Sequence, residues 1–269
     1  MSSPLVLGQI ALSFHAAAAS VVQQVCEREG VAVVIKEAPH ERIYEMLRDA
    51  EVDMVCSAWL PGSHGAYVAP YEDQLVKLGV LYQPYTLWGV PDYVPIDVLA
   101  SVADLAKPEI VAKMNKRIQG IGPGAGISRF SREIIEHYAL YKYGYEFHNG
   151  TLTECASAFE AAYAARDWVI VPLWHPQYLH SRYQIRELTE PNGLLRGKDA
   201  ATLVIRKDAL HKLTLRLQQT LTRMQLGNTQ VAQLDYAISV QNISPPVAAC
   251  QWLDQHPKEL LQWTAGGTK

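Results

Sequence analysis

Residues 5–58 read LVLGQIALSFHAAAASVVQQVCEREGVAVVIKEAPHERIYEMLRDAEVDMVCSA, and this stretch decides the fold class. It contains three short apolar runs that are typical of buried strands, at residues 5–10, 31–36 and 53–58. Amphipathic helical segments separate them: the first ends at Gly30, which suits a left-handed helix cap, and the second covers residues 40–49. Strand, helix, strand, helix, strand predicts a parallel sheet covered by helices.

The same alternation returns in the middle of the chain. Strands are expected at residues 117–122, 145–149 and 167–174, with helices over 127–138 and 151–165. Residues 87–95, with two prolines, are a natural crossover between the two α/β units, and residues 200–208 resemble the strand that brings the chain back. After residue 208 the pattern becomes helical, with an apolar stripe from Leu210 to Met224 and helices around 229–240 and 246–262.

The composition is that of an ordinary globular protein. Of 269 residues, 49% are apolar and 19% are charged. A formal net charge of −3 without any run of basic residues argues against nucleic acid as a partner. No apolar segment approaches the length of a membrane span. The four cysteines lie far apart, which excludes the usual zinc spacings and predicts buried free thiols, with no metal and no cofactor.

Three loops follow expected strands at the edge where open α/β sheets bind ligands. These loops read AWLPGSH at 58–64, GIGPGAG at 120–126 and LWHPQY at 173–178. Because the loops come from both α/β units, we expect a ligand cleft between two lobes. The glycine-rich loop differs from a dinucleotide-binding loop, since its spacing is not G-x-G-x-x-G.

Longer segments around these loops carry a family resemblance. They read DMVCSAWLPGSHGAY at 53–67, VPDYVP at 90–95, GIGPGAGISRFSREIIEHYAL at 120–140 and WVIVPLWHPQYLHSRYQIRELTEPNG at 168–193. In this order they resemble the substrate-binding proteins of ABC transporters for glycine betaine, proline betaine, carnitine and choline, over roughly residues 5–208. The resemblance implies an α/β, two-lobed periplasmic-binding-protein fold, each lobe a mostly parallel sheet flanked by helices, with a helical C-terminal tail. We expect lobe I to comprise 1–87 and 207–269, and lobe II to comprise 88–206.

The ligand chemistry that the resemblance implies explains the tryptophans in the loops. A trimethylammonium group has charge but no N–H donor, so electron-rich ring faces are its best partners. Carried over from the family motifs, Trp59 and Trp174 are the expected opposing walls of an aromatic cage. Phe14 follows the first strand, where several relatives have tryptophan, and is a further candidate. Trp88 is a candidate either for the cage or for packing at the crossover.

A betaine also needs its carboxylate held. Gly124, Ala125 and Gly126 open a helix, so their backbone N–H groups and the helix dipole favour an anion. His64 corresponds to a family residue that contacts the anionic end of the ligand; the alternative is a solvated loop histidine. Tyr67 either covers the same end or packs against the following helix.

Some positions depart from the family pattern. Where relatives often show Trp-x-Pro-His-Trp, this chain has His175 and Gln177 in the segment after Trp174, and both are candidate ligand contacts. Ala125 stands where some relatives have a cage tryptophan, and Ala16 near a position where choline-selective members have aspartate. These departures favour a carboxylate-bearing or bulkier cation over choline.

Two other function classes remain open from the residues. An enzyme could use Cys56 as a nucleophile with His64 or His175 as its base, although no activating cation is evident beside the thiol. A stand-alone ligand sensor could keep this fold without a transporter. We favour a binding protein that performs no chemistry.

The resemblance also implies partners and a location. The expected partners are a small cationic or zwitterionic solute and an ABC permease at the membrane, with the chain acting as a monomer. The expected location is periplasmic or extracytoplasmic and membrane-associated. No secretory signal is recognisable in the first residues, which leaves a cytoplasmic location open.

Overall fold

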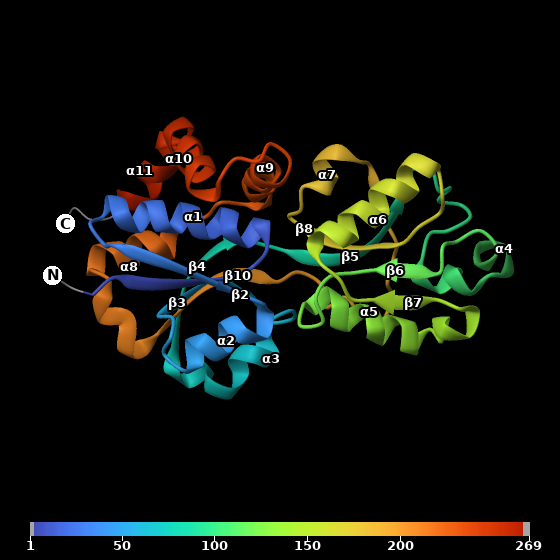
Figure 1. Cartoon of the computed structure of the whole chain (residues 1–269). Helices are drawn as coiled ribbons and strands as arrows, with labels where there is room; N and C mark the ends of the chain where they lie inside the picture. Colours follow the sequence, from blue (N-terminus) through green and yellow to red (C-terminus); the bar gives the residue numbers. More distant parts are fainter. Residues whose placement is uncertain (1–2, 266–269) are drawn as a thin grey trace. The chain divides into compact units, whose positions relative to one another are not determined.

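In the computed structural model, which describes residues 3–265, the chain divides into two units (Figure 1). The first unit runs to Pro84 and resumes at Asp199, and the second covers Tyr85–Lys198. The two α/β units expected from the sequence are therefore present, and the first is discontinuous along the chain. Each unit is described by itself below.

The first unit begins with the strand–helix alternation that its sequence predicts. Its parallel strands are β1 (Leu5–Ile10), β2 (Val33–Ala38) and β3 (Met54–Leu60), with β1 between the other two. Helices α1 (Ser13–Arg28) and α2 (His40–Arg48) connect them. Gly30 has a φ of +82°, which explains why glycine follows α1 there.

Two more strands complete this sheet, and they change its character. The strand β10 (Ala200–Arg206) lies between β3 and β4 (Leu75–Tyr82) and runs antiparallel to both, so the strand order is β2-β1-β3-β10-β4. The expected boundary at residue 206 is therefore wrong, because hydrogen bonds to β3 and β4 place β10 in the first unit. Between β3 and β4 the chain forms α3 (Gly65–Val68) and the 3-10 helix η1 (Ala69–Gln74).

The second unit is less parallel than expected. Its three-stranded sheet has the order β8-β5-β9 and is antiparallel throughout, with β5 (Tyr85–Pro91), β8 (Val171–His175) and β9 (Ile185–Glu187). Only the short pair β6 (Arg117–Gln119) and β7 (Glu146–His148) is parallel. Most of the expected crossover at 87–95 is the strand β5, and residues 85–87 belong to this unit because β5 pairs with β8.

Helices surround the strands of the second unit. They are η2 (Val102–Ala106), α4 (Pro108–Val111), α5 (Gly126–His137), η3 (Leu140–Tyr143), α6 (Leu152–Ala165) and α7 (Leu179–Arg182). Thr151 caps α6, since its hydroxyl accepts from the Glu154 N–H while the Glu154 carboxylate accepts from the Thr151 N–H. Within the described residues, α5 packs on both β5 and β8.

The C-terminal tail is helical as expected and packs on the first unit. It comprises η4 (Lys207–Lys212), α8 (Leu215–Arg223), α9 (Asn228–Ser239), α10 (Pro245–Gln255) and α11 (Pro257–Thr264). Helices α9 and α10 cover α1, and α8 covers β4 (Figure 1). The expected helix over 246–262 is broken at His256, because the following Pro257 disfavours the helical conformation there.

Close packing holds α2 and α8 on the sheet of the first unit. On one face, α2 places Ile43 and Leu47 in an apolar cluster with Ile10 and Val55. On β4, a side chain at Gly79 would lie 2.2 Å from the Leu221 carbonyl oxygen of α8, so only glycine allows this approach. Across residues 3–265, no helix combines the length and apolarity needed to cross a membrane.

Candidate functional site

Trp59 lies one residue before the end of β3, where the chain turns back on itself. The His64 N–H donates to the Trp59 carbonyl oxygen at 2.8 Å, and the Trp59 N–H donates to His64 Nδ1 at 2.9 Å. The loop between these residues is thus closed by two hydrogen bonds at its base. The side chain of Trp59 is buried, with 4% of the residue exposed.

Asp199 holds the same loop from the other side. Its two carboxylate oxygens accept from the Gly62 N–H at 2.6 Å and the Ser63 N–H at 3.0 Å. Asp199 is buried and directly precedes β10, the strand that pairs with β3. Charge-assisted bonds to two successive N–H groups keep the loop in one conformation.

Tyr82 fixes the orientation of the Trp59 ring. The indole Nε1–H donates to Tyr82 Oη at 3.1 Å, and the two rings meet edge to face. Both residues are opposite Ala201, which lies on the intervening strand β10. The small side chain of Ala201 leaves room for this bond across the sheet. Burial raises the pKa of Tyr82, so its phenol stays neutral and remains a hydrogen-bonding group.

Two rings from the first turn of α1 adjoin Trp59. The ring centroid of Phe14 lies 5.4 Å from that of Trp59, and the centroid of His15 lies 5.6 Å from it. At this spacing Phe14 and Trp59 touch each other and form one continuous wall. A cation held between two opposing rings lies within about 6 Å of both ring centroids, and the rings themselves do not touch. Phe14 and Trp59 are too close together to hold a cation between them in this way.

His64 completes this cluster and has a defined tautomer. Its Nδ1 accepts from the Trp59 backbone N–H, so this nitrogen carries no proton, and Tyr44 Oη at 2.9 Å must be a second donor to it. In the neutral ring the proton is therefore on Nε2, which makes that atom a donor. His64 is 2% exposed, which rules out the alternative of a solvated loop histidine.

Tyr67 packs against the helix that precedes β3. Its ring stacks on Tyr44 of α2 with a centroid separation of 5.3 Å and an interplanar angle of 13°. It also lies against the apolar cluster of α2. The expected packing alternative named the following helix, whereas the structure packs Tyr67 on the preceding helix α2.

In the second unit, strand register places two candidate tryptophans on one face. Trp174 is opposite Thr86 and Trp88 is opposite Pro172, and these positions alternate with residues of the other face. Trp88 is fully buried, and its Nε1–H donates to Ser131 Oγ of α5 at 2.8 Å. Of the two alternatives for Trp88, these contacts favour packing on α5.

The glycine-rich loop opens α5 as the sequence predicts. Ala125 is the N-cap residue and Gly126 the first residue of the helix, and both are buried. Arginines of α5 bond carbonyls of the preceding turn: Arg129 donates to Gly124 and Arg132 to Pro123. The first N–H groups of a helix have no acceptor within the helix, so this end favours an anion.

His175 points away from the face that carries Trp174, and Gln177 lies beyond the end of β8. His175 is the next residue on β8 and points to the opposite face, where it stacks on Tyr85 at 5.0 Å and on His180 at 3.6 Å. Gln177 is fully buried, and its Oε1 accepts from the Leu179 N–H at 2.6 Å at the start of α7. Both side chains thus support the segment after Trp174.

The surroundings of Cys56 do not suit a nucleophile. Cys56 is fully buried in β3, and burial raises the pKa of its thiol, with Cys26 as a further cause. A thiol that stays protonated is a poor nucleophile. Cys26 and Cys155 are buried as expected, whereas Cys250 is partly exposed. Within residues 3–265 no three His, Cys, Asp or Glu side chains are placed to hold a metal ion.

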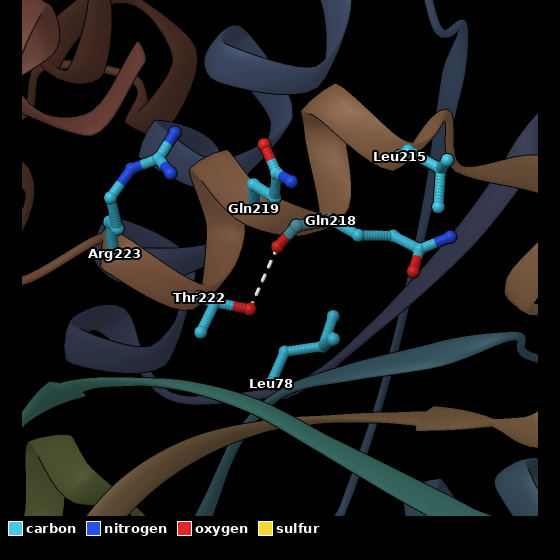
Figure 2. Close-up of a pocket in the computed structure, with 6 residues that line it drawn as sticks. All are labelled: Leu78, Leu215, Gln218, Gln219, Thr222 and Arg223. Carbon is cyan, nitrogen blue, oxygen red and sulfur yellow. Dashed lines mark hydrogen bonds between the residues drawn. The ribbon is translucent and has the colours of Figure 1, made fainter. Parts of the chain in front are cut away.

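Two cavities of the first unit are lined by residues outside the Trp59 cluster. One, of about 290 Å³, is shown in Figure 2 and is lined by Leu78, Leu215, Gln218, Gln219, Thr222 and Arg223. It has no aromatic lining and so lacks a ring face for a cation. The other, of about 230 Å³, lies between α9 and α10 beside Trp252, whose ring is covered by His256 at 4.2 Å and by Trp263 at 6.0 Å.

Sequence reasoning missed four residues of the Trp59 cluster. They are His15, Tyr44, Tyr82 and Asp199. Three of them come from elements distant in the chain, so no motif joined them to Trp59. His15 adjoins the candidate Phe14, and a polar residue at the start of an otherwise alanine-rich helix was the available signal.

Comparisons with known proteins bear on the family and the fold. One curated relative, the glycine betaine/carnitine transport binding protein GbuC of Listeria monocytogenes serotype 1/2a (strain 10403S), is 21% identical over 164 residues. The match covers 61% of this chain and spans about half of that protein, 54% of its length.

Solved structures show the same fold over nearly the whole chain. Lactococcal OpuAC, solved in its closed-liganded conformation with glycine betaine, has a TM-score of 0.85 at 21% identity and covers 98% of this chain and 100% of its own. The glycine betaine, L-proline-binding protein ProX of Borrelia burgdorferi has a TM-score of 0.86 at 21% identity, with 97% of each chain covered. These likenesses confirm the expected two-lobed binding-protein fold.

The family itself is shown by a sequence model. The OpuAC model, described as the substrate binding domain of the ABC-type glycine betaine transport system, matches residues 3–255. The chain therefore belongs to the family of substrate-binding domains of ABC-type glycine betaine transport systems.

Proposed function

We propose that this chain binds a betaine-type quaternary ammonium solute reversibly, without chemical change, and delivers it to an ABC permease. The observation that supports this most is the Trp59 cluster of the first unit. There Phe14 and His64 adjoin a tryptophan whose ring is oriented by Tyr82 and whose loop is held by Asp199. Rigid groups that need no reordering on binding favour affinity.

The ring faces suit the cationic end of such a solute. A trimethylammonium group gains about 2 kcal/mol from a desolvated aromatic face, and neighbouring faces add to this. Trp59 and Phe14 present two adjoining rings. His64, whose ring stacks beside Trp59, is kept as a predicted contact of the carboxylate.

The second unit has candidates of the same two kinds. Trp174 is a ring for the cation, and the α5 N-terminus at Gly124, Ala125 and Gly126 is a set of donors for the anion. We keep these as predicted ligand groups, together with Tyr67. For Trp88, His175 and Gln177 the contacts described above favour a supporting role.

Partner and location are part of the same proposal. The Listeria relative is named a transport binding protein for glycine betaine and carnitine, and the lactococcal structure holds glycine betaine. We extend these properties to this chain. It would then act outside the cytoplasm, next to a membrane permease that receives the solute.

Isothermal titration calorimetry with glycine betaine, proline betaine, carnitine and choline tests the proposal. We expect micromolar binding of at least one, and at least tenfold weaker binding, about 1.4 kcal/mol, for both Trp59→Ala and Trp174→Ala. Trp168→Ala is the matched control, because the Lys113 ammonium already lies over the Trp168 ring, and its affinity should be unchanged. No heat with any of the four solutes would contradict the proposed function.

A further inference from the structure

His15 is a buried polar side chain inside the Trp59 cluster. It is 1% exposed, and its ring centroid lies 4.5 Å from Phe14, 5.6 Å from Trp59 and 6.0 Å from His64. The buried positions that follow in α1 are mostly alanine and valine. A histidine therefore occupies a place where an apolar residue would fit the helix pattern.

The hydrogen bonding of His15 is incomplete. Among residues 3–265, no hydrogen-bond partner reaches its Nδ1, and that atom is shielded from solvent. A buried polar atom without a partner costs free energy in the folded protein. A solute that brings an oxygen to His15 Nδ1 would remove this cost. The free energy regained would then add to the affinity for that solute.

The charge of His15 is compatible with a cation close by. Burial, and then the neighbouring His40, lower the pKa of His15 well below its usual value. At neutral pH the ring is therefore uncharged and does not repel an ammonium group over Trp59. A neutral imidazole carries its proton on one of the two nitrogens, so Nδ1 can be an N–H donor.

A carboxylate beside Trp59 lies within reach of His15. The His15 ring centroid is 5.6 Å from that of Trp59, and a carboxylate oxygen accepts from an imidazole N–H at about 2.9 Å. In glycine betaine the ammonium and carboxylate are one methylene apart. We place the cation over Phe14 and Trp59, so that this carboxylate meets the adjoining His15.

We propose that His15 Nδ1 donates a hydrogen bond to the carboxylate of the bound solute, which makes His15 a determinant of selectivity for zwitterionic betaines over simple quaternary ammonium ions. This inference rests on the proposed function. It adds to that function a residue and a criterion for choosing among solutes.

The test compares three solutes on three proteins by calorimetry. Glycine betaine has a carboxylate, choline a hydroxyl, and tetramethylammonium neither. His15→Leu removes the donor, and we expect it to weaken glycine betaine at least tenfold while tetramethylammonium changes less than threefold. His15→Asn keeps an N–H near the Nδ1 position and should bind glycine betaine within about threefold of the wild type.

A stability measurement separates this role from a structural one. His15→Leu removes a buried unpartnered nitrogen, so its melting temperature should equal or exceed that of the wild type while its betaine affinity falls. If the leucine variant fails to fold, nitrogen NMR of the wild-type imidazole replaces it, and glycine betaine should shift the Nδ1 resonance.

The outcomes are distinct. Equal losses for glycine betaine and tetramethylammonium, an unchanged affinity in His15→Leu, or an unmoved Nδ1 resonance would overturn the role of His15. A larger loss for choline than for glycine betaine would overturn the choice of a carboxylate. Absence of binding by the wild-type protein would instead be a failure of the proposed function.

Discussion

Trp59 in the first unit and Trp88 in the second both donate their indole N–H to a hydroxyl, yet their surroundings differ. Trp59 is near the end of a strand, bonds Tyr82 in its own sheet, and adjoins the rings of Phe14 and His64. Trp88 is in the middle of β5 and bonds Ser131 on a covering helix. The same residue with the same kind of bond thus packs against a helix at a strand centre, whereas at a strand end it belongs to the cluster that we propose for recognition.

Replacement of Trp88 should have the largest effect on stability. Trp88→Ala removes a fully buried side chain under α5, and we expect the free energy of unfolding to fall by about 3–5 kcal/mol, measured by urea denaturation. Trp88→Phe keeps most of the volume, so its betaine affinity should stay within threefold of the wild type. A tenfold loss of affinity in Trp88→Phe would place Trp88 among the ligand contacts and remove the contrast with Trp59.

The histidine pair beside Trp174 should make the stability depend on pH. The ring of His180 stacks on His175, and its Nε2–H donates to the Trp174 carbonyl oxygen at 3.1 Å. Burial and then His175 lower the pKa of His180 to about 4. In the unfolded chain the ring titrates near its ordinary pKa of about 6.5.

Whether stability rises or falls with pH depends on whether the folded or the unfolded chain binds the proton more readily. As pH falls from about 6.5 toward 4, His180 gains a proton in the unfolded chain before it does so in the folded protein. Its contribution to the free energy of unfolding therefore falls by up to about 3 kcal/mol and then levels off. His180→Asn should show a flatter pH profile in urea denaturation. Parallel profiles for both proteins over this range would remove His180 as the cause.

The loop that presents Trp59 offers a smaller, sharper test. Asp199→Asn keeps the size of the side chain but replaces one acceptor and removes the charge, so we expect a loss of about 2 kcal/mol in stability. Betaine binding should weaken as well, because the loop between Trp59 and His64 loses its second support. Asp208→Asn is the control, since the Asp208 side chain is 72% exposed and its ion pair with Arg206 is screened by solvent. Equal effects of the two substitutions would show that the Asp199 carboxylate does not hold the loop.

The first unit could be predicted well because its pattern is local. Strands β1 and β3, helices α1 and α2, and the positive φ at Gly30 all follow from apolar spacing and cap residues within residues 5–58. The start of α5 at Gly126 follows in the same way from the small residues before it. Local propensity and side-chain periodicity act over a few residues, so the sequence displays them directly.

Pairings between distant segments were not predictable in this way. The apolar runs of β5 and β8 look alike whether their partners are parallel or antiparallel, and only the register shows that Trp88 and Trp174 share a face. Similarly, nothing near Trp59 in the chain points to Tyr82 or Asp199, which meet it through β10.

The sequence by itself determined the family motifs, the elements of the first unit and the residue types suited to a quaternary ammonium ion. The tertiary structure alone decided which of those residues are oriented together, and it added His15, Tyr44, Tyr82 and Asp199 to the Trp59 cluster. The physical reason is range: helix and strand formation depends on neighbours along the chain, whereas a side chain's hydrogen-bond partners depend on segments that only folding brings within about 3 Å.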